Sequence, residues 1–253
     1  MILTSFYSLL LAAFAALSPC KKKDPKPIGD NIEILLKNYH IVFQDILTPI
    51  DWNKWDWREP WSGDQPTQKE NTMWVKENTI QEDRGVCLQA TREGDLNYCG
   101  MISSHKFLEW KYGYVEVSAK IPPEGFKYWF AIWMYDKNGW LPEVDILEMM
   151  KETSQSLSFT HHWLKNGVHE SDGNTFKWKQ DFSNDFHRYG LLWESDKLVW
   201  YVDGLPYYEC TSNIPDVPLF LICNIQSQEF KRLFLPNEIP MCGLVDRITL
   251  WQK

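Results

Sequence analysis

The sequence predicts an all-β fold, a sandwich or barrel, rather than an α/β fold. Short segments rich in β-branched and aromatic residues recur along the chain, and turn residues separate them. Apolar spacing of the helical kind is almost absent. Aromatic residues form 15% of the 253 residues and include 14 Trp, which suits pleated sheets and surfaces that stack on flat ligands. A chain of this length can build a single domain around one core.

The first expected strand covers residues 41–47, and a loop with four tryptophans follows it. Trp52, Trp55, Trp57 and Trp61 lie in this loop, and four indoles facing water together would be costly. They form either a platform for a sugar or a cap on the end of the sandwich, and both alternatives stay open. Further strands are expected at residues 86–92, 101–107, 112–121, 128–135, 143–150, 157–164, 188–193, 198–202, 219–226 and 244–251.

Two segments give more detail. Asp203-Gly204 is the strongest hairpin signal, because type I′ turns favour this dipeptide. Along residues 128–135, side chains alternate between two faces of the expected strand. One set should enter the core and the other is free to face a ligand. The sets are Tyr128, Phe130, Ile132 and Met134, and Trp129, Ala131, Trp133 and Tyr135.

Three carboxylates, Glu143, Asp145 and Glu148, stand in an otherwise apolar segment. Burying an ionised side chain is costly unless it is paired, hydrated or used. A regular strand would place Glu148 on the opposite face from the other two. A β-bulge around residues 146–147 would return it to their face. We therefore expect a bulged strand, and not a helix, because Pro142 and the spacing of the outer acids do not suit one.

A row of three carboxylates matches the needs of a retaining glycosidase. Such an enzyme uses two carboxyl groups about 5–5.5 Å apart, one as nucleophile and one as acid/base. A third acid between them would couple their titrations and hold the end groups in different protonation states.

The segment E-V-D-I-L-E resembles the bulged signature E-x-D-x-x-E of glycoside hydrolase family 16, which contains laminarinases, lichenases, agarases and carrageenases. Residues 107–123 and 130–134 are similar to strands around the family's active site, residues 185–204 to its hairpin, and residues 244–251 to its closing strand. The resemblance spans most of residues 43–252. Two features depart from the family pattern: Pro142 replaces a common Gly, and the loop from Trp140 to Glu143 is short. Both bear on the substrate more than on the chemistry.

The resemblance implies a concanavalin-like jelly-roll β-sandwich of two antiparallel sheets, with a cleft on the concave face. It implies an endo-acting β-glycan hydrolase that retains configuration. Glu143 would be the nucleophile, Glu148 the acid/base, and Asp145 the residue that couples with Glu143 and helps to set the two protonation states.

The resemblance also implies substrate-binding residues. Trp133 and Trp140 would stack on sugars near the acids, and one of two adjacent histidines would donate a hydrogen bond near the reacting sugar. We favour His162 over His161 because it shares parity with Ser158 and Thr160.

No cofactor is required for this chemistry, and the spacing of the histidines predicts no metal at the site. The resemblance places Asp246 where the family has a calcium ligand on the convex face, and so implies a structural calcium ion there. Asn224 is polar in an apolar strand and must be hydrogen-bonded, either in the cleft or within the sheet. His187 is expected to be structural.

The net charge of −8 argues against nucleic acid as a partner. The expected partner is a polysaccharide, with β-1,3- or mixed-linkage β-1,3-1,4-glucan first, because Trp140 precedes the acids much as in laminarinases. An agarose-type galactan is the enzyme alternative, since the short loop would change the cleft. Transglycosylation would use the same residues. A non-catalytic, glycan-binding surface lipoprotein is the alternative of another class, and we expect a monomer.

The amino terminus is typical of an export signal. Residues 1–19 would be the signal peptide, Cys20 a lipid anchor of the bacterial kind, residues 20–30 a tether and residues 31–253 the catalytic domain. The expected location is the cell surface or periplasm, with the membrane contacted only through Cys20. A signal peptide cut elsewhere is the alternative, which would leave the protein secreted.

The other five cysteines, Cys87, Cys99, Cys210, Cys223 and Cys242, lack metal-type spacing. They form either one disulfide or a set of small buried hydrophobes.

Overall fold

The structure, a computed structural model, describes residues 24–62, 65–123, 128–149 and 153–253. The expected signal segment and Cys20 lie outside these residues. Within the described ranges, none of the helices has the length and apolar character needed to cross a membrane.

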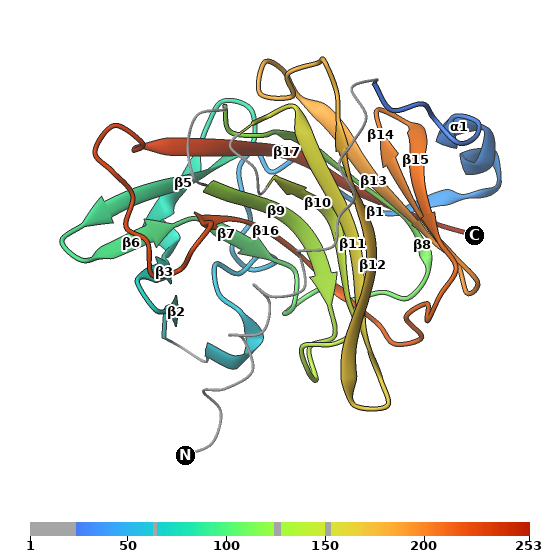
Figure 1. Ribbon diagram of the computed structural model, residues 1–253, viewed down its shortest axis with the longest axis horizontal. Coiled ribbons are helices and arrows are strands. Elements are labelled where there is room, and N and C mark those ends of the chain that lie inside the picture. The colour runs from blue at the N-terminus through green and yellow to red at the C-terminus, as the bar shows by residue number, and fades with distance from the viewer. Residues whose placement is uncertain (1–23, 63–64, 124–127, 150–152) are drawn as a thin grey trace.

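Two sheets pack face to face around one core (Figure 1). The large sheet has eleven strands and the small sheet six. In spatial order the large sheet contains β15 (Leu205–Cys210), β14 (Leu198–Val202), β13 (His187–Trp193), β8 (Gly113–Lys120), β17 (Met241–Gln252), β5 (Val86–Glu93), β6 (Leu96–Cys99), β3 (Thr72–Trp74) and β2 (Thr67–Lys69), with β1 (His40–Asp45) beside β17 and β4 (Thr79–Gln81) beside β5. The small sheet contains β12 (Val168–Lys177), β11 (Ser156–Lys165), β10 (Glu143–Met149), β9 (Tyr128–Tyr135), β16 (Phe220–Ser227) and β7 (Met101–Ser103).

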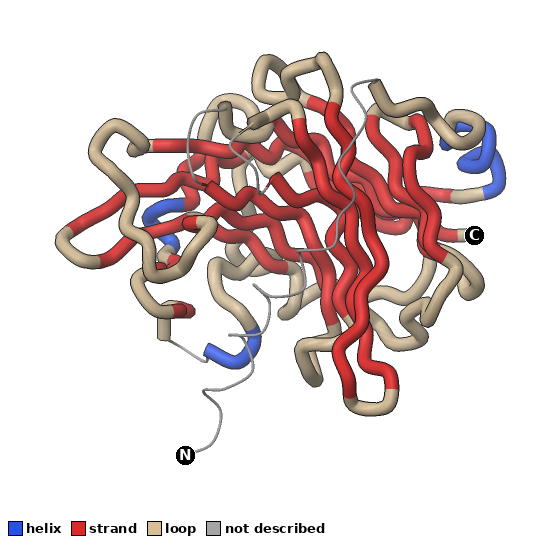
Figure 2. Tube along the Cα trace, in the orientation of Figure 1, coloured by secondary structure: helices blue, strands red, loops and turns tan. Residues whose placement is uncertain are grey.

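This architecture confirms the predicted all-β sandwich. Its strand pairs are antiparallel except for β3 and β6, which run parallel. Helical turns are short and lie at the periphery (Figure 2). They are α1 (Ile32–Leu35), η3 (Leu36–Asn38), η4 (Pro60–Ser62) and η5 (Lys76–Asn78).

The described part of the expected tether lies against the domain. The backbone N–H of Lys179 donates to Asp24 Oδ1 at 2.7 Å, and Ile28 N–H donates to Pro206 O at 2.8 Å. The Asn31 side chain then caps α1 by accepting from Glu33 N–H at 3.0 Å. Ile32 packs against Tyr114 and its neighbours, on the face of the large sheet turned away from the core.

Alternation decides which side chains fill the core. On β9, Tyr128, Phe130, Ile132 and Met134 are fully buried and belong to the core, so the other set faces away from the large sheet. In the Trp-rich loop, Trp55 is buried with its ring centroid 5.1 Å from that of Phe107, and it caps one end of the sandwich. The side chain of Trp61 lies outside the described residues.

Six strands fall outside the expected segments: β2, β3, β4, β6, β12 and β15. Two of them follow left-handed turns. Asp203 and Gly204 have φ of 50° and 82° and lead into β15, as their hairpin signal indicates. Asn166 and Gly167 have φ of 54° and 77° and join β11 to β12. The strand expected at residues 101–107 ends at Ser103.

Cys87 of β5 and Cys242 of β17 form a disulfide, and Cys99, Cys210 and Cys223 are buried free thiols. Of the two alternatives for the five cysteines, the disulfide thus holds for one pair and the small buried side chains for the other three.

Candidate active site

The three acids share one face because β10 is bulged. On the β9 side, Asp145 pairs with Trp133, but the next partner, Ile132, pairs with Leu147. On the β11 side the register shifts between Asp145 and Glu148. One extra residue on β10 thus turns Glu148 to the face of Glu143. From the opposite sheet, Trp200 Nε1 donates to the backbone oxygen of Asp145 at 2.7 Å, which holds the bulge from the core side.

We call this side of the small sheet, which is turned away from the core, the acid face. The strand register places on it Trp129, Ala131, Trp133 and Tyr135 of β9, the three acids of β10, Ser158, Thr160 and His162 of β11, and Asn224 of β16. The acids are well covered: Glu143 is 8% exposed, and Asp145 and Glu148 are each 3% exposed.

Each acid has a different partner. Trp140 Nε1 donates to Glu143 Oε2 at 2.6 Å. His162 Nε2 lies 3.1 Å from Asp145 Oδ2, an ion-pair contact when the imidazole is protonated. Glu148 Oε1 accepts from Trp129 Nε1 at 3.0 Å, and the Thr160 hydroxyl lies 3.5 Å from Oε2. The two end acids thus accept hydrogen bonds from indole N–H groups, whereas the middle acid has an imidazole at ion-pair distance.

Burial raises the pKa of all three acids. For Glu143, burial and the charge of Asp145 raise the pKa to about 8, against the lowering effects of His162 and of the Trp140 hydrogen bond. Burial raises the pKa of Asp145 to about 8 as well. For Glu148, burial and the charge of Asp145 hold the pKa well above its ordinary value. Burial therefore favours the protonated form of each acid, and at Glu143 the charge of His162 and the Trp140 hydrogen bond oppose this effect.

The arrangement can divide acid and base roles. Glu148 is suited to donate a proton, because crowding and burial favour its neutral form. Both end acids have an indole hydrogen bond and the charge of His162 on the side of ionisation. The assignment of Glu143 as the group that ionises therefore follows the resemblance to the bulged signature and not a difference in these partners. Perturbed carboxyl groups clustered in this way are a common mark of an active site.

The structure brings the expected aromatic residues to the acids. Trp140 contacts Glu143 directly. Trp133 is half-buried, stacks on Tyr135 with ring centroids 4.9 Å apart, and donates from Nε1 to Asn224 Oδ1 at 2.7 Å. Asn224 Nδ2 in turn donates to Gln226 Oε1 at 3.1 Å. Asn224 therefore lies on the acid face, as one alternative expected, and forms its hydrogen bonds within the sheet, as the other expected.

The two adjacent histidines point to opposite faces of β11, as neighbours on a strand do. His162 is on the acid face, and His161 is fully buried on the other side of the strand with its ring over Trp163. His187 pairs with Asp203, its Nδ1 lying 2.8 Å from Oδ2, so it supports the β13 to β14 region as expected.

Two residues at the site were not identified from the sequence. Trp129 was placed on the correct face, but not as a partner of Glu148. His169 was missed because strand β12 was missed, and its Nε2 lies 2.9 Å from His162 Nδ1. The Asn166-Gly167 turn could have revealed it, because a two-residue hairpin there sets Leu164 opposite His169.

Three residues of the acid face also resemble a metal-binding cluster. Ring nitrogen and carboxylate oxygen atoms of Glu143, Asp145 and His162 lie within 4.8 Å of one another, as in a metal-binding cluster. Because His162 already supplies a counter-charge to Asp145 and Trp140 already bonds to Glu143, we assign these residues to acid–base chemistry.

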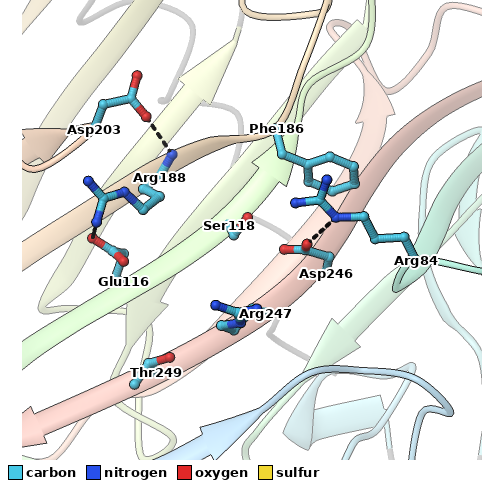
Figure 3. Close-up of a pocket in the computed structure, with 9 residues that line it drawn as sticks. All are labelled: Arg84, Glu116, Ser118, Phe186, Arg188, Asp203, Asp246, Arg247 and Thr249. Carbon is cyan, nitrogen blue, oxygen red and sulfur yellow. Dashed lines mark hydrogen bonds and ion pairs between the residues drawn. The ribbon is translucent and has the colours of Figure 1, made fainter.

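A hollow of about 290 Å³ lies on the other side of the molecule, over the large sheet (Figure 3). Arg84 Nε donates to Asp246 Oδ2 at 2.5 Å, and the Arg84 guanidinium lies 3.7 Å from the centroid of the Phe186 ring. Asp246 Oδ1 is buried and has no hydrogen-bond partner among the described residues. Two of the arginines that line this hollow contact acids: Arg84 pairs with Asp246, and Arg188 Nη1 lies 3.8 Å from Glu116 Oε2.

The free oxygen of Asp246 fits a cation, since a buried carboxylate oxygen without a donor is a ready calcium ligand. The other oxygen is occupied by Arg84, whose side chain is 59% exposed and can move away. Asp246 is therefore the residue that would hold the expected calcium ion, which would be structural.

Comparisons with known proteins agree with the fold. The family model described as glycosyl hydrolases family 16 matches residues 66–228. The chain is 27% identical over 271 residues to a glucan endo-1,3-β-glucosidase A1 of Niallia circulans, covering 89% of this chain and 40% of that protein. It is 30% identical over 141 residues to the endo-1,3-1,4-β-glycanase ExsH of Rhizobium meliloti (strain 1021), covering 54% of this chain and 30% of that protein.

Among solved structures, the laminarinase catalytic domain of Thermotoga maritima MSB8 superposes with a TM-score of 0.69 at 22% identity, over 85% of this chain and 98% of that one. This likeness concerns the fold. The chain thus spans less than half the length of the two curated relatives and nearly the whole of a single catalytic domain.

Proposed function

The chain belongs to glycosyl hydrolase family 16, and on that basis we propose that it is a retaining, endo-acting β-glycan hydrolase whose substrate is a β-1,3- or mixed-linkage β-1,3-1,4-glucan. The observation that carries this proposal is the bulge of β10. It aligns Glu143, Asp145 and Glu148 on one face, where each end acid has its own indole donor.

The reaction would proceed by double displacement. Glu143 attacks the anomeric carbon while Glu148 gives its proton to the leaving oxygen, which breaks the glycosidic bond and forms a glycosyl ester on Glu143. Glu148, now a carboxylate, takes a proton from water. That water attacks the anomeric carbon and releases Glu143. Asp145 couples electrostatically with both end acids throughout.

Glucan is preferred as the substrate because one similar protein is named a glucan endo-1,3-β-glucosidase and another an endo-1,3-1,4-β-glycanase. Trp133 and Trp140 flank the acids and offer indole rings on which the apolar face of a glucosyl unit can stack. An agarose-type galactan is the rival substrate, because the segment between Trp140 and Glu143 is short.

We further propose that the protein acts outside the cytoplasm as a monomer, held at the membrane by a lipid on Cys20. The apolar residues 2–17 before Cys20 support export, and the Cys87 to Cys242 disulfide suits an oxidising compartment. Mass spectrometry of the mature amino terminus tests the anchor. A diacylglycerol-bearing Cys20 is expected, whereas an unmodified terminus elsewhere would contradict it.

The substrate test is depolymerisation of laminarin, barley mixed-linkage glucan, agarose and a neutral galactan by wild type and by Glu143→Gln. We expect wild type to cleave laminarin or the barley glucan and Glu143→Gln to cleave neither. Asn174→Ala is the matched control, because Asn174 is exposed on β12 and its side chain points away from the acid face. Cleavage of a galactan alone would move the substrate to the rival class. Retardation by a polymer in an affinity gel without any cleavage would favour a glycan-binding protein.

A further inference from the structure

A chain of contacts leads from the acid row to the edge of the small sheet. His162 Nε2 lies 3.1 Å from Asp145 Oδ2, and His162 Nδ1 lies 2.9 Å from His169 Nε2. His162 is 3% exposed, so neither of its ring nitrogens can rely on water. His169 is half-buried and lies on the neighbouring strand β12. One imidazole therefore connects the middle acid to a second imidazole.

Charged and titratable groups from several strands surround His162. The three acids of β10 interact with it electrostatically, and His161 on its own strand and His169 on β12 are its imidazole neighbours. Lys69 of β2 also lies within electrostatic range of Glu143, but burial lowers its pKa to about 8. His162 is the basic group in contact with Asp145.

A protonated imidazole has two N–H donors and no acceptor. If His162 carries a proton beside Asp145, its Nδ1–H needs an acceptor, and His169 Nε2 is placed to accept it. His169 suits this role when neutral, and burial, followed by the charge of His162, lowers its pKa. The two histidines would thus share one proton, which stays on His162.

We propose that His169 is a positioning residue that accepts the Nδ1 proton of His162 and so keeps an imidazolium beside Asp145. The effect of this proton on catalysis rests on the proposed function. The imidazolium stabilises the carboxylate form of Glu143, the attacking group. Without the acceptor, the cationic form of His162 would leave a buried N–H unsatisfied. The proton would then be lost, and Glu143 would need a higher pH to ionise.

His169 has a second contact that must be separated from the first. Its ring centroid lies 5.2 Å from that of Trp140, which bonds to Glu143. His169→Phe keeps an aromatic ring against Trp140 and removes the acceptor. His169→Gln keeps an acceptor and removes the ring. Asn174→Ala, on the same strand but the opposite face, is the control.

The experiment measures kcat and KM against pH on the cleaved glucan, together with the ring ¹⁵N resonances of His162 at pH 6. We expect His169→Phe to lose about tenfold in kcat at pH 6 with KM nearly unchanged, and to move the acidic limb of the profile to higher pH. His169→Gln should restore most of the loss. In wild type and His169→Gln, both His162 nitrogens should resonate as in an imidazolium, and in His169→Phe as in a neutral ring.

The reverse order, with His169→Gln impaired and His169→Phe active, would overturn the proposal in favour of ring packing on Trp140. A neutral His162 in the wild-type spectrum would overturn it as well. The spectrum needs no turnover, so it decides the proton state even if no glucan is cleaved. Failure of the proposed function would therefore not be mistaken for failure of this inference.

Discussion

The acid row and Asp56 are both buried carboxylate sites, but they differ in their partners. Asp56 is 3% exposed, as are Asp145 and Glu148. Arg58 Nε donates to Asp56 Oδ1 at 3.0 Å, and Lys106 forms an ion pair with Oδ2. Burial would raise the pKa of Asp56, but hydrogen bonds and charges from Arg58 and Lys106 outweigh it and hold the pKa below its ordinary value.

Asp56 also ties its loop to the sheet, because it exchanges backbone hydrogen bonds of 2.9 and 2.7 Å with Ser103. The acid row has instead three acids, indole donors and one imidazole contact. Burial alone therefore does not make a carboxylate reactive. Permanent cations make Asp56 a structural acid, and their scarcity leaves the row of β10 able to exchange protons.

The largest expected effect is on catalysis by the row. Glu148→Gln should lower kcat on the glucan about 10³-fold, because general-acid assistance is lost. Its melting temperature should not fall, since a crowded acid is replaced by a neutral amide. An aryl glycoside with an acidic leaving group should lose much less, because its departure needs little protonation. An equal loss on both substrates would contradict the assignment of Glu148 as the acid.

Asp56→Asn should show the opposite behaviour. Removing the carboxylate leaves Arg58 and Lys106 without their counter-charge, and breaking a buried ion pair costs about 3 kcal/mol of the free energy of unfolding. Urea unfolding measures this loss, and kcat per folded molecule should be unchanged. A large drop in kcat with little loss of stability would place Asp56 in the catalytic machinery instead.

The pH dependence of stability should separate the two sites. The folded-state pKa of Glu143 and Asp145 is about 8, above the ordinary 4.5 and 3.8, so the folded state holds more protons and stability falls as the pH rises toward 8. Burial lowers the pKa of His161 to about 4 from 6.5, so stability falls as the pH drops through that window. Asp56, with a lowered pKa, loses its contribution only at still more acidic pH.

The two raised acids outnumber the one lowered histidine, so the melting temperature should fall as the pH rises from about 4.5 to 8, most steeply above pH 6.5 where His161 no longer opposes the trend. Glu143→Gln should reduce the alkaline decline, whereas Asp56→Asn should leave its slope intact. An undiminished decline in Glu143→Gln would mean that the acid row is already ionised in the folded protein.

The smallest expected effect concerns Asp246, which combines features of both sites: one oxygen is paired with Arg84 and one is free. We propose that calcium binds at the free oxygen. Millimolar calcium should then stabilise wild type by about 1–3 kcal/mol, as expected for a weak extracellular-type site. Arg84→Ala should increase the gain and Asp246→Asn should abolish it. Equal melting temperatures in calcium and in chelator for wild type and Arg84→Ala would exclude the site.

Much of this molecule could be predicted from local patterns. The acid spacing required a bulge, and the register shifts on both sides of β10 confirm it. Parity separated His162 from His161 and sorted the β9 side chains. The partners of Glu148 and of His162 could not be predicted, because they depend on which strands become neighbours. Trp129 reaches Glu148 across β9 and β10, and His169 reaches His162 from a strand that was not expected.

The short strands β2 to β4 were missed for a related reason. Each has three residues, too few for an alternating pattern to be visible, and their pairing in the sheet defines them. Asp56 forms ion pairs with Arg58 and Lys106. The pair with Lys106 could not be predicted, because the two residues lie far apart in the sequence.

The most direct test of the acid row as a retaining pair is the configuration of the first product. Wild type is mixed with a reduced-end-labelled glucan oligosaccharide, and ¹H NMR follows the anomeric protons before mutarotation. A β-anomer appearing first is the result expected if Glu143 forms a glycosyl ester and Glu148 serves as acid and then base. An α-anomer appearing first would mean single displacement by water, and Glu143 would then be a base rather than the nucleophile.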